Sequence, residues 1–171
     1  MTLVIMSRIA IRFITFALTQ ISVYAVAVRR VVGGEYAVIN EFPHLGLLTG
    51  KCNKNEQWTC GASILNQRIL LTAAHCFQDC DLKPRRQNRI MVFFGSTYTS
   101  DMQIQRRVSQ IATHARWDEI TGKNDIALAF VRRDIPFGRR VKRVIISRQF
   151  PTVTRLFEAF VAGWGDDWRL G

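Results

Sequence analysis

Two residues of this sequence, His75 and Asp125, carry side chains that together could activate a nucleophile. A hydroxyl nucleophile needs a base to take its proton, and the usual base is an imidazole whose second ring nitrogen is held by a carboxylate. His75 stands in the run LTAAHC, residues 71–76, and Asp125 stands in the run NDIAL, residues 124–128. Because the two residues lie far apart in the chain, only the fold can bring them together. Their spacing is therefore no evidence, and the local context of each has to carry the interpretation.

Short strands are the elements that must position these residues. Apolar residues form short runs or alternate with other residues over 45–48, 90–94, 103–111 and 126–130. The polar pair Asn66-Gln67 suits a turn between two further short segments, 57–65 and 68–72. Residues 157–162 have the composition of one more strand. Many short strands without helical crossovers predict an all-β barrel or sandwich.

The first 27 residues have the features of a secretory signal peptide. Arg8 and Arg12 precede an apolar stretch, and the small-x-small triplet over 25–27 fits a cleavage site. The alternative is an uncleaved membrane anchor, but the uninterrupted apolar run is shorter than the ~20 residues that a spanning helix needs. We therefore expect cleavage, no membrane attachment afterwards, and a secreted, extracellular protein.

The chain is basic, with a formal net charge of +11 from 24 basic and 13 acidic residues. Four of the arginines and none of the acids lie in the first 30 residues, so the remainder carries +7. We interpret the arginine clusters as solvated surface, with binding of a polyanion such as a sulfated polysaccharide as the alternative. Nucleic acid is not an expected partner, because the leader directs the chain outside the cell and no nucleic-acid motif occurs. The clusters are Arg85, Arg86 and Arg89; Arg106 and Arg107; Arg132 and Arg133; and Arg139, Arg140, Lys142 and Arg143.

Four cysteines, Cys52, Cys60, Cys76 and Cys80, are available for disulfides in a secreted chain. Four cysteines allow three connectivities, and the sequence alone does not choose among them. A zinc site is the alternative, but the spacing contains no CxxC pair and His75 has another explanation. We therefore expect neither a metal ion nor a cofactor.

The runs 71–76 and 124–128 resemble the histidine and aspartate segments of the trypsin/chymotrypsin-like serine proteases, peptidase family S1. The run VVGG over 31–34, which follows Arg29-Arg30, resembles the activation junction of that family, and VAGWG over 161–165 resembles the start of its second half. This resemblance implies a chymotrypsin-like double antiparallel β-barrel, with a first barrel over 31–135 and only the start of the second. It also implies a signal peptide over 1–27, a short propeptide over 28–30 and an incomplete peptidase domain over 31–171.

The resemblance also implies roles for individual residues. His75 is the expected general base, and Asp125 is expected to orient it. An activating protease would cut after Arg30 and expose a new amine on Val31. The implied activity is that of a monomeric serine endopeptidase acting on protein or peptide substrates.

The cysteines can also be paired by this resemblance. Cys60 and Cys76 match the family disulfide beside the histidine, and it would hold the base in place. Cys52 and Cys80 are then left to pair with each other, with Cys80 as a free thiol as the alternative.

The 171 residues contain no Gly-Asp-Ser-Gly-Gly segment, which in this family carries the nucleophilic serine. Without that serine and the oxyanion hole, we expect the chain as written to be inactive. One hypothesis is a fragment of an active secreted endopeptidase, and the intact histidine and aspartate segments favour it. The other is a catalytically inactive truncated homologue that acts as a binding or decoy protein.

Overall fold

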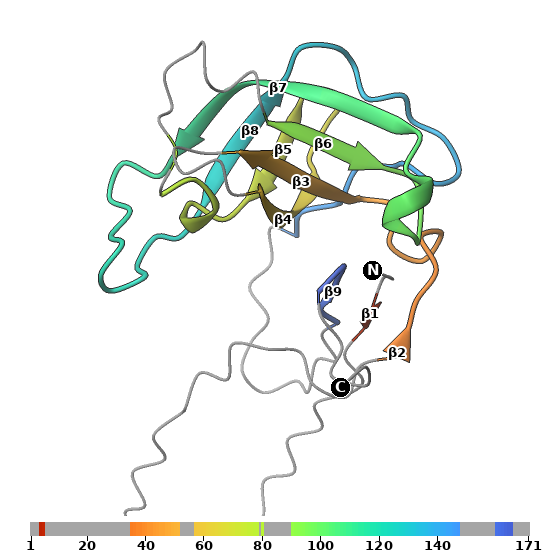
Figure 1. Ribbon diagram of the computed structural model, residues 1–171, viewed down its shortest axis with the longest axis horizontal. Coiled ribbons are helices and arrows are strands. Elements are labelled where there is room, and N and C mark those ends of the chain that lie inside the picture. The colour runs from red at the N-terminus through yellow and green to blue at the C-terminus, as the bar shows by residue number, and fades with distance from the viewer. Residues whose placement is uncertain are drawn as a thin grey trace, which may run out of the picture.

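Six antiparallel strands form a closed barrel in the computed structural model (Figure 1). The structure describes residues 4–5, 35–51, 57–78, 80, 90–147 and 160–165. Around the barrel the strands follow the order β3-β4-β5-β8-β7-β6, so every strand is hydrogen-bonded to two neighbours and no barrel edge stays open. The strands are β3 (Leu45–Lys51), β4 (Gln57–Ile64), β5 (Ile69–Thr72), β6 (Met91–Phe94), β7 (Ile104–Thr113) and β8 (Ala127–Val131). The predicted all-β fold is confirmed.

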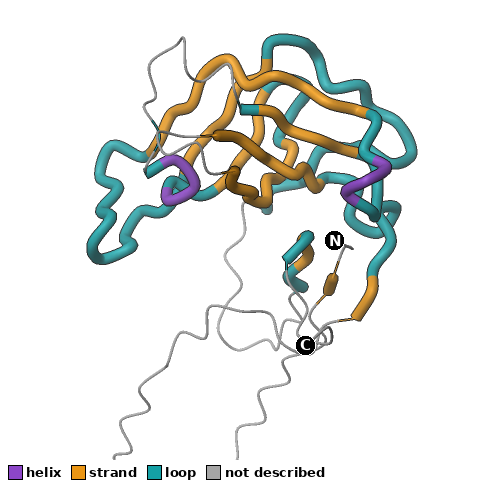
Figure 2. The backbone as a smooth tube through the Cα atoms, viewed as in Figure 1, coloured by secondary structure: helices purple, strands orange, loops and turns teal. Residues whose placement is uncertain are grey.

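Helical structure is confined to single turns in the described part of the chain (Figure 2). These turns are two 3-10 helices, η1 (His75–Phe77) and η2 (Thr99–Asp101). No helix among the described residues has the length and apolar character needed to cross a membrane.

The barrel interior is filled by one face of each strand, because successive side chains of a strand point to opposite sides. On β8 the small Ala127 and Ala129 are buried, whereas Leu128 and Phe130 are partly exposed. Large side chains from the other strands fill most of the interior, so β8 directs its small alanine side chains inward. The largest fully buried side chains of the core cluster include Leu48, Ile64, Leu70, Val92, Phe94 and Val108.

The boundaries of several strands agree with the sequence pattern. The runs 90–94, 103–111 and 126–130 correspond to β6, β7 and β8 within a few residues. The predicted turn at Asn66-Gln67 is confirmed, since the Arg68 N–H donates to Asn66 Oδ1 at 2.8 Å. Of the strand expected over 157–162, residues 157–159 lie outside the described residues, and the structure has β9 (Ala162–Gly163) instead.

A second, smaller cluster of buried apolar side chains lies against the outside of the barrel. Trp164, 5% exposed, packs with Ile39, Leu45 and Met102, and its indole N–H donates to the Thr97 carbonyl at 2.9 Å. Among the described residues, 160–165 are the part of the chain that corresponds to the expected second barrel, and this segment packs on β3 through Trp164.

A three-stranded sheet lies beside this cluster. β1 (Val4–Ile5) pairs with β2 (Glu35–Tyr36) on one side and with β9 on the other. β1 falls within the segment predicted to be a cleaved leader. That prediction stays a prediction, since residues 6–34 lie outside the described residues.

Two isoleucines provide a matched test of the barrel core. Ile64 is completely buried and Ile120 is 96% exposed. We expect Ile64→Ala to lower the free energy of unfolding by about 2–5 kcal/mol, because it removes buried apolar surface and leaves a cavity. Ile120→Ala, the same chemical change, should alter it by no more than about 0.5 kcal/mol. Urea denaturation of both variants measures the difference.

A milder variant keeps this test decisive if Ile64→Ala fails to fold. Ile64→Val should cost about 0.5–1.5 kcal/mol. Equal losses for the Ile64 and Ile120 variants would contradict the barrel core described above.

Candidate active site

The pairing of β5 with β8 places His75 and Asp125 at the same end of the barrel. The two strands are antiparallel, and Thr72 lies opposite Ala127. Thr72 is the last residue of β5, just before His75, and Ala127 is the first residue of β8, just after Asp125. The chain therefore leaves β5 and enters β8 at one corner, where the η1 turn and the β7–β8 loop lie close together (Figure 2).

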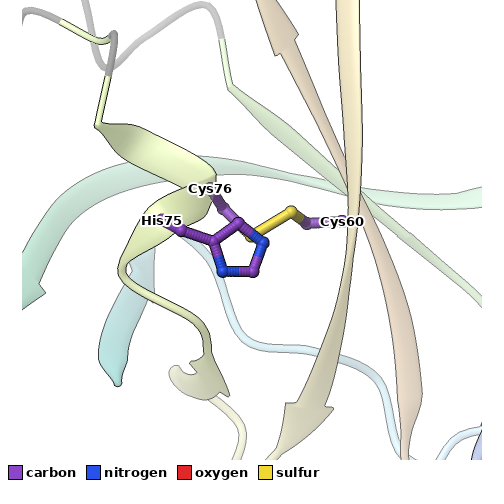
Figure 3. Close-up of side chains that lie close together, drawn as sticks. All are labelled: Cys60, His75 and Cys76. Carbon is purple, nitrogen blue, oxygen red and sulfur yellow. A yellow bond between two sulfur atoms is a disulfide. The ribbon is translucent and has the colours of Figure 1, made fainter. Parts of the chain in front are cut away.

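Three contacts hold the η1 turn against the barrel. Phe77 is 2% exposed and packs edge-to-face on Trp58 of β4, with ring centroids 5.5 Å apart. Cys76 forms a disulfide with Cys60, also on β4 (Figure 3). Just before the turn, the Thr72 hydroxyl donates to the Gly61 carbonyl at 2.8 Å. His75 is thus carried by a segment that is fixed on both sides.

His75 and Asp125 are joined by two hydrogen bonds. The His75 Nδ1 atom lies 2.7 Å from Asp125 Oδ2, and the His75 backbone N–H donates to Oδ1 at 2.8 Å. With a proton on Nδ1, the neutral imidazole donates to the carboxylate and keeps a lone pair on Nε2. The His75 side chain is 54% exposed and that of Asp125 is 31% exposed, so Nε2 belongs to an accessible ring. The arrangement is suited to general-base chemistry.

Asn124 turns the chain so that the Asp125 carboxylate faces η1. Its φ of 58° lies in the left-handed region, which asparagine tolerates better than most residues. The side-chain amide of Asn124 donates to the Arg116 carbonyl at 2.7 Å, and its own carbonyl accepts the Ile126 N–H at 2.8 Å. Asn124 is not among the site residues predicted from the sequence. An Asn-Asp pair directly before a strand is the signal that could have pointed to it.

The pKa of Asp125 reflects two opposing effects. Burial raises it, but hydrogen bonds from the His75 side chain and from the His75 and Ala74 backbone outweigh the burial, together with the charge interaction with His75. The pKa consequently lies below its usual value of 3.8. The carboxylate is held in the ionised form that can accept from the imidazole.

Other predicted site residues are only partly described. Arg30, Val31 and Cys52 lie outside the described residues. Cys80 is disulfide-bonded, so the alternative of a free thiol is wrong. Cys60, His75 and Cys76 place potential metal-ligand atoms within 4.8 Å of one another, but both sulfurs belong to the disulfide and offer no thiolate.

The described residues of the basic clusters are mostly exposed, in agreement with their interpretation as solvated surface. Arg106 is the exception, being partly buried, and it donates from Nε to the Asp134 carbonyl at 2.7 Å. The exposed members are Arg107, Arg132, Arg133, Arg139, Arg140, Lys142 and Arg143, and residues 85–89 lie outside the described part of the chain.

The lowered pKa of Asp125 predicts a pH-dependent contribution to stability. An ionised carboxylate with a folded-state pKa below its unfolded value stabilises the fold above the unfolded pKa, and this stabilisation is lost as the pH falls through the folded pKa. We expect the difference in free energy of unfolding between wild type and Asp125→Asn to shrink as the pH is lowered from about 5 to about 2. Urea denaturation over a pH series measures it.

The control for this titration is Glu119→Gln, which makes the same carboxyl-to-amide change at an exposed residue. The pH dependence of the Asp125→Asn difference is compared with that of this variant. A pH-independent difference for Asp125→Asn would contradict the hydrogen-bonded carboxylate.

Comparison with known proteins connects this geometry to a family. Residues 31–171 match the sequence profile of the family described as Trypsin. Serine protease SP24D of Anopheles gambiae is 31% identical over 143 residues, which cover 83% of this chain and 49% of that protein. Trypsin alpha of Drosophila melanogaster is 30% identical over 136 residues, covering 80% and 49% respectively. The chain thus spans about half the length of these curated relatives.

Solved structures show the same fold. The scabies mite inactivated protease paralogue S-I1 superposes with a TM-score of 0.54 and 28% identity, over 61% of this chain and 45% of that chain. The structure therefore has the chymotrypsin-like fold, with its first barrel closed and its second only partly covered. From the profile match over 31–171 and this fold, we conclude that the chain belongs to the trypsin family of serine proteases, peptidase family S1.

Proposed function

We propose that these residues are the histidine–aspartate half of a secreted serine-type endopeptidase, whose nucleophilic serine lies outside the 171 residues. The contact between His75 Nδ1 and Asp125 Oδ2, at 2.7 Å, is the observation that carries this proposal. This contact joins an imidazole and a carboxylate on the first barrel, which supports a base and its orienting residue. Membership of the trypsin family gives that pair its chemical context.

In the proposed reaction, His75 Nε2 takes the proton of the serine hydroxyl as the hydroxyl attacks a peptide carbonyl. The same imidazole then returns the proton to the leaving amine, and an acyl-enzyme remains for water to hydrolyse. Asp125 keeps the imidazole in the tautomer with a lone pair on Nε2 and stabilises the imidazolium that forms. The substrate class is protein or peptide, and these steps require no metal ion or cofactor.

We also propose that the protein is secreted and is activated by cleavage. The leader over 1–27 would direct the chain out of the cell, where the disulfide joining Cys60 and Cys76 is stable. An activating protease would cut after Arg30 and expose the amine of Val31. The sequence Arg-Arg-Val-Val-Gly-Gly over 29–34 supports this site.

A second candidate function is that of an inactive homologue that binds a partner. The solved structure of S-I1, 28% identical to this chain, is described as an inactivated protease paralogue, which favours this candidate. The partner would be a protease, an inhibitor or a polyanion. Exposed basic residues such as Arg132, Arg133 and Arg140 would contribute the polyanion surface.

The 3′ sequence of the full transcript separates the two candidates. A reading frame that continues into a Gly-Asp-Ser-Gly-Gly segment supports the endopeptidase. A stop codon directly after Gly171 in an abundant transcript overturns that proposal and leaves the binding protein.

Substitutions in a product that includes the serine segment test the assigned roles. We expect His75→Ala to lower kcat by about 10⁶-fold and Asp125→Asn by about 10⁴-fold, because the first removes the base and the second its correct tautomer. Hydrolysis of a chromogenic peptide measures both effects.

The matched control is His114→Ala. His114 is a partly buried histidine outside the pair, and its Nδ1 accepts the Arg116 N–H at 3.1 Å. This variant should keep nearly full activity. Activity retained by His75→Ala would exclude His75 as the base.

A further inference from the structure

The chain that follows β8 crosses the end of the barrel opposite the candidate site, where β5 begins and β8 ends. Within 132–147 the Ile135 N–H donates to the Gln67 carbonyl just before β5, at 2.8 Å. The Lys142 N–H donates to the Pro43 carbonyl just before β3, also at 2.8 Å. Figure 1 shows the stretch after β8, in blue, on the other side of the barrel from the β7–β8 loop. Side chains of this segment therefore lie far from the His75 end of the barrel.

Two buried side chains hold this segment on the barrel and leave its basic residues outside. Ile135 is 0% exposed and Val141 is 2% exposed, and both belong to the main core cluster. Just before Val141 the chain makes a tight turn, in which the Gly138 N–H donates to the Val141 carbonyl at 2.9 Å. Arg139 and Arg140 are the central residues of this turn, and both are exposed.

Strand β7 brings one more arginine to this end. The Arg132 N–H donates to the Arg107 carbonyl at 3.1 Å, so Arg107 lies beside the start of the segment. We call the exposed basic residues of this end the distal basic face. Its seven members are Arg107, Arg132, Arg133, Arg139, Arg140, Lys142 and Arg143.

The positive charge of the distal basic face is not neutralised by the described acidic residues. Asp134 is the only acidic residue within 132–147, and its carboxylate pairs with Arg68, which is not a member of the face. No member of the face forms an ion pair with an acidic residue in the described part of the chain. The face therefore presents an excess of positive charge to solvent, and such a surface attracts polyanions.

The site end of the barrel has no such excess. The β7–β8 loop carries three acidic and two basic residues, which are Asp118, Glu119, Asp125, Arg116 and Lys123. Its balance is thus slightly negative. A polyanion is consequently drawn to the distal end, and there it leaves His75 Nε2 uncovered.

We propose that the distal basic face binds a linear sulfated polysaccharide. Six of its seven members are arginines, whose planar guanidinium groups donate paired hydrogen bonds to oxyanions. The members form two groups, Arg107 with 132–133 and then 139–143, so a polymer with repeated sulfates can contact both groups at once. The choice of an extracellular polymer rests on the proposed secretion. Binding there holds the protein on the polymer with its candidate site open.

A calorimetric titration of the disulfide-bonded 171-residue chain with heparin, a sulfated polysaccharide, tests this surface. We expect binding at about 0.15 M salt that weakens steadily as salt is added, because bound polyanions release counterions. The double variant Arg132→Gln with Arg133→Gln should weaken binding by at least about 10-fold, because it removes two charge-assisted contacts. Arg139→Gln with Arg140→Gln should have an effect of the same size. Every variant keeps the same leader, so the leader arginines do not enter the comparison.

The matched control is the double variant Arg116→Gln with Lys123→Gln, which removes two exposed positive charges at the site end. It should change the heparin affinity by no more than about twofold, because salt screens charges beyond about 8 Å. A loss as large as that of the distal variants would show that only net charge matters, and would overturn the proposal. So would an absence of heparin binding at this salt concentration.

Two further probes separate a sulfated polysaccharide from other polyanions. Double-stranded DNA and vesicles that contain phosphatidylserine should both bind more weakly than heparin. A duplex with a persistence length of about 50 nm, like a flat bilayer, contacts only part of a face that follows the curve of the barrel. Binding of either probe as tight as that of heparin would overturn the choice of ligand. These measurements need neither secretion nor the serine, so failed binding contradicts this surface, whereas retention of the chain inside cells contradicts the proposed secretion.

Discussion

The site depends above all on the hydrogen-bonded register between β5 and β8. Thr72 pairs with Ala127, which sets the end of one strand beside the start of the other. A shift of one residue in this pairing would reverse which side chains of β8 face the core, because strand side chains alternate between two faces. It would bury Leu128 where Ala127 and Ala129 now pack, and it would also move Asp125 away from His75. Core packing and site geometry are therefore set by the same pairing.

The sequence predicts the positions of the strands better than it predicts how the strands pair with one another. Strand positions over 90–94 and 126–130 follow from short apolar runs, and the histidine and aspartate are recognisable from their neighbours. The register of β5 on β8 is not visible in either segment alone, because it results from packing around the whole barrel. Likewise, the linear sequence shows neither the positive φ of Asn124 nor the hydrogen bond from its side chain to the Arg116 carbonyl.

Burial also differs from what apolar patterning suggests. Leu128 and Phe130 are the larger residues of β8, yet its alanines face the interior. Phe94 and the aliphatic residues of the other strands occupy that space. Neither His44 nor His114 stands in a recognisable motif, and both are partly buried. Burial lowers the pKa of His44. The volume of the interior is a property of all six strands, so a single strand does not reveal its own inward face.

The most direct test of the site is the tautomer of His75, measured by ¹⁵N NMR of the imidazole in the disulfide-bonded 171-residue chain. If Asp125 accepts from Nδ1, the neutral ring carries its proton on Nδ1 and shows an unprotonated Nε2. The Asp125→Asn variant should then lose this preference. A wild-type ring with its proton on Nε2, or a spectrum unchanged by Asp125→Asn, would contradict the His75–Asp125 hydrogen bond on which the proposed base rests.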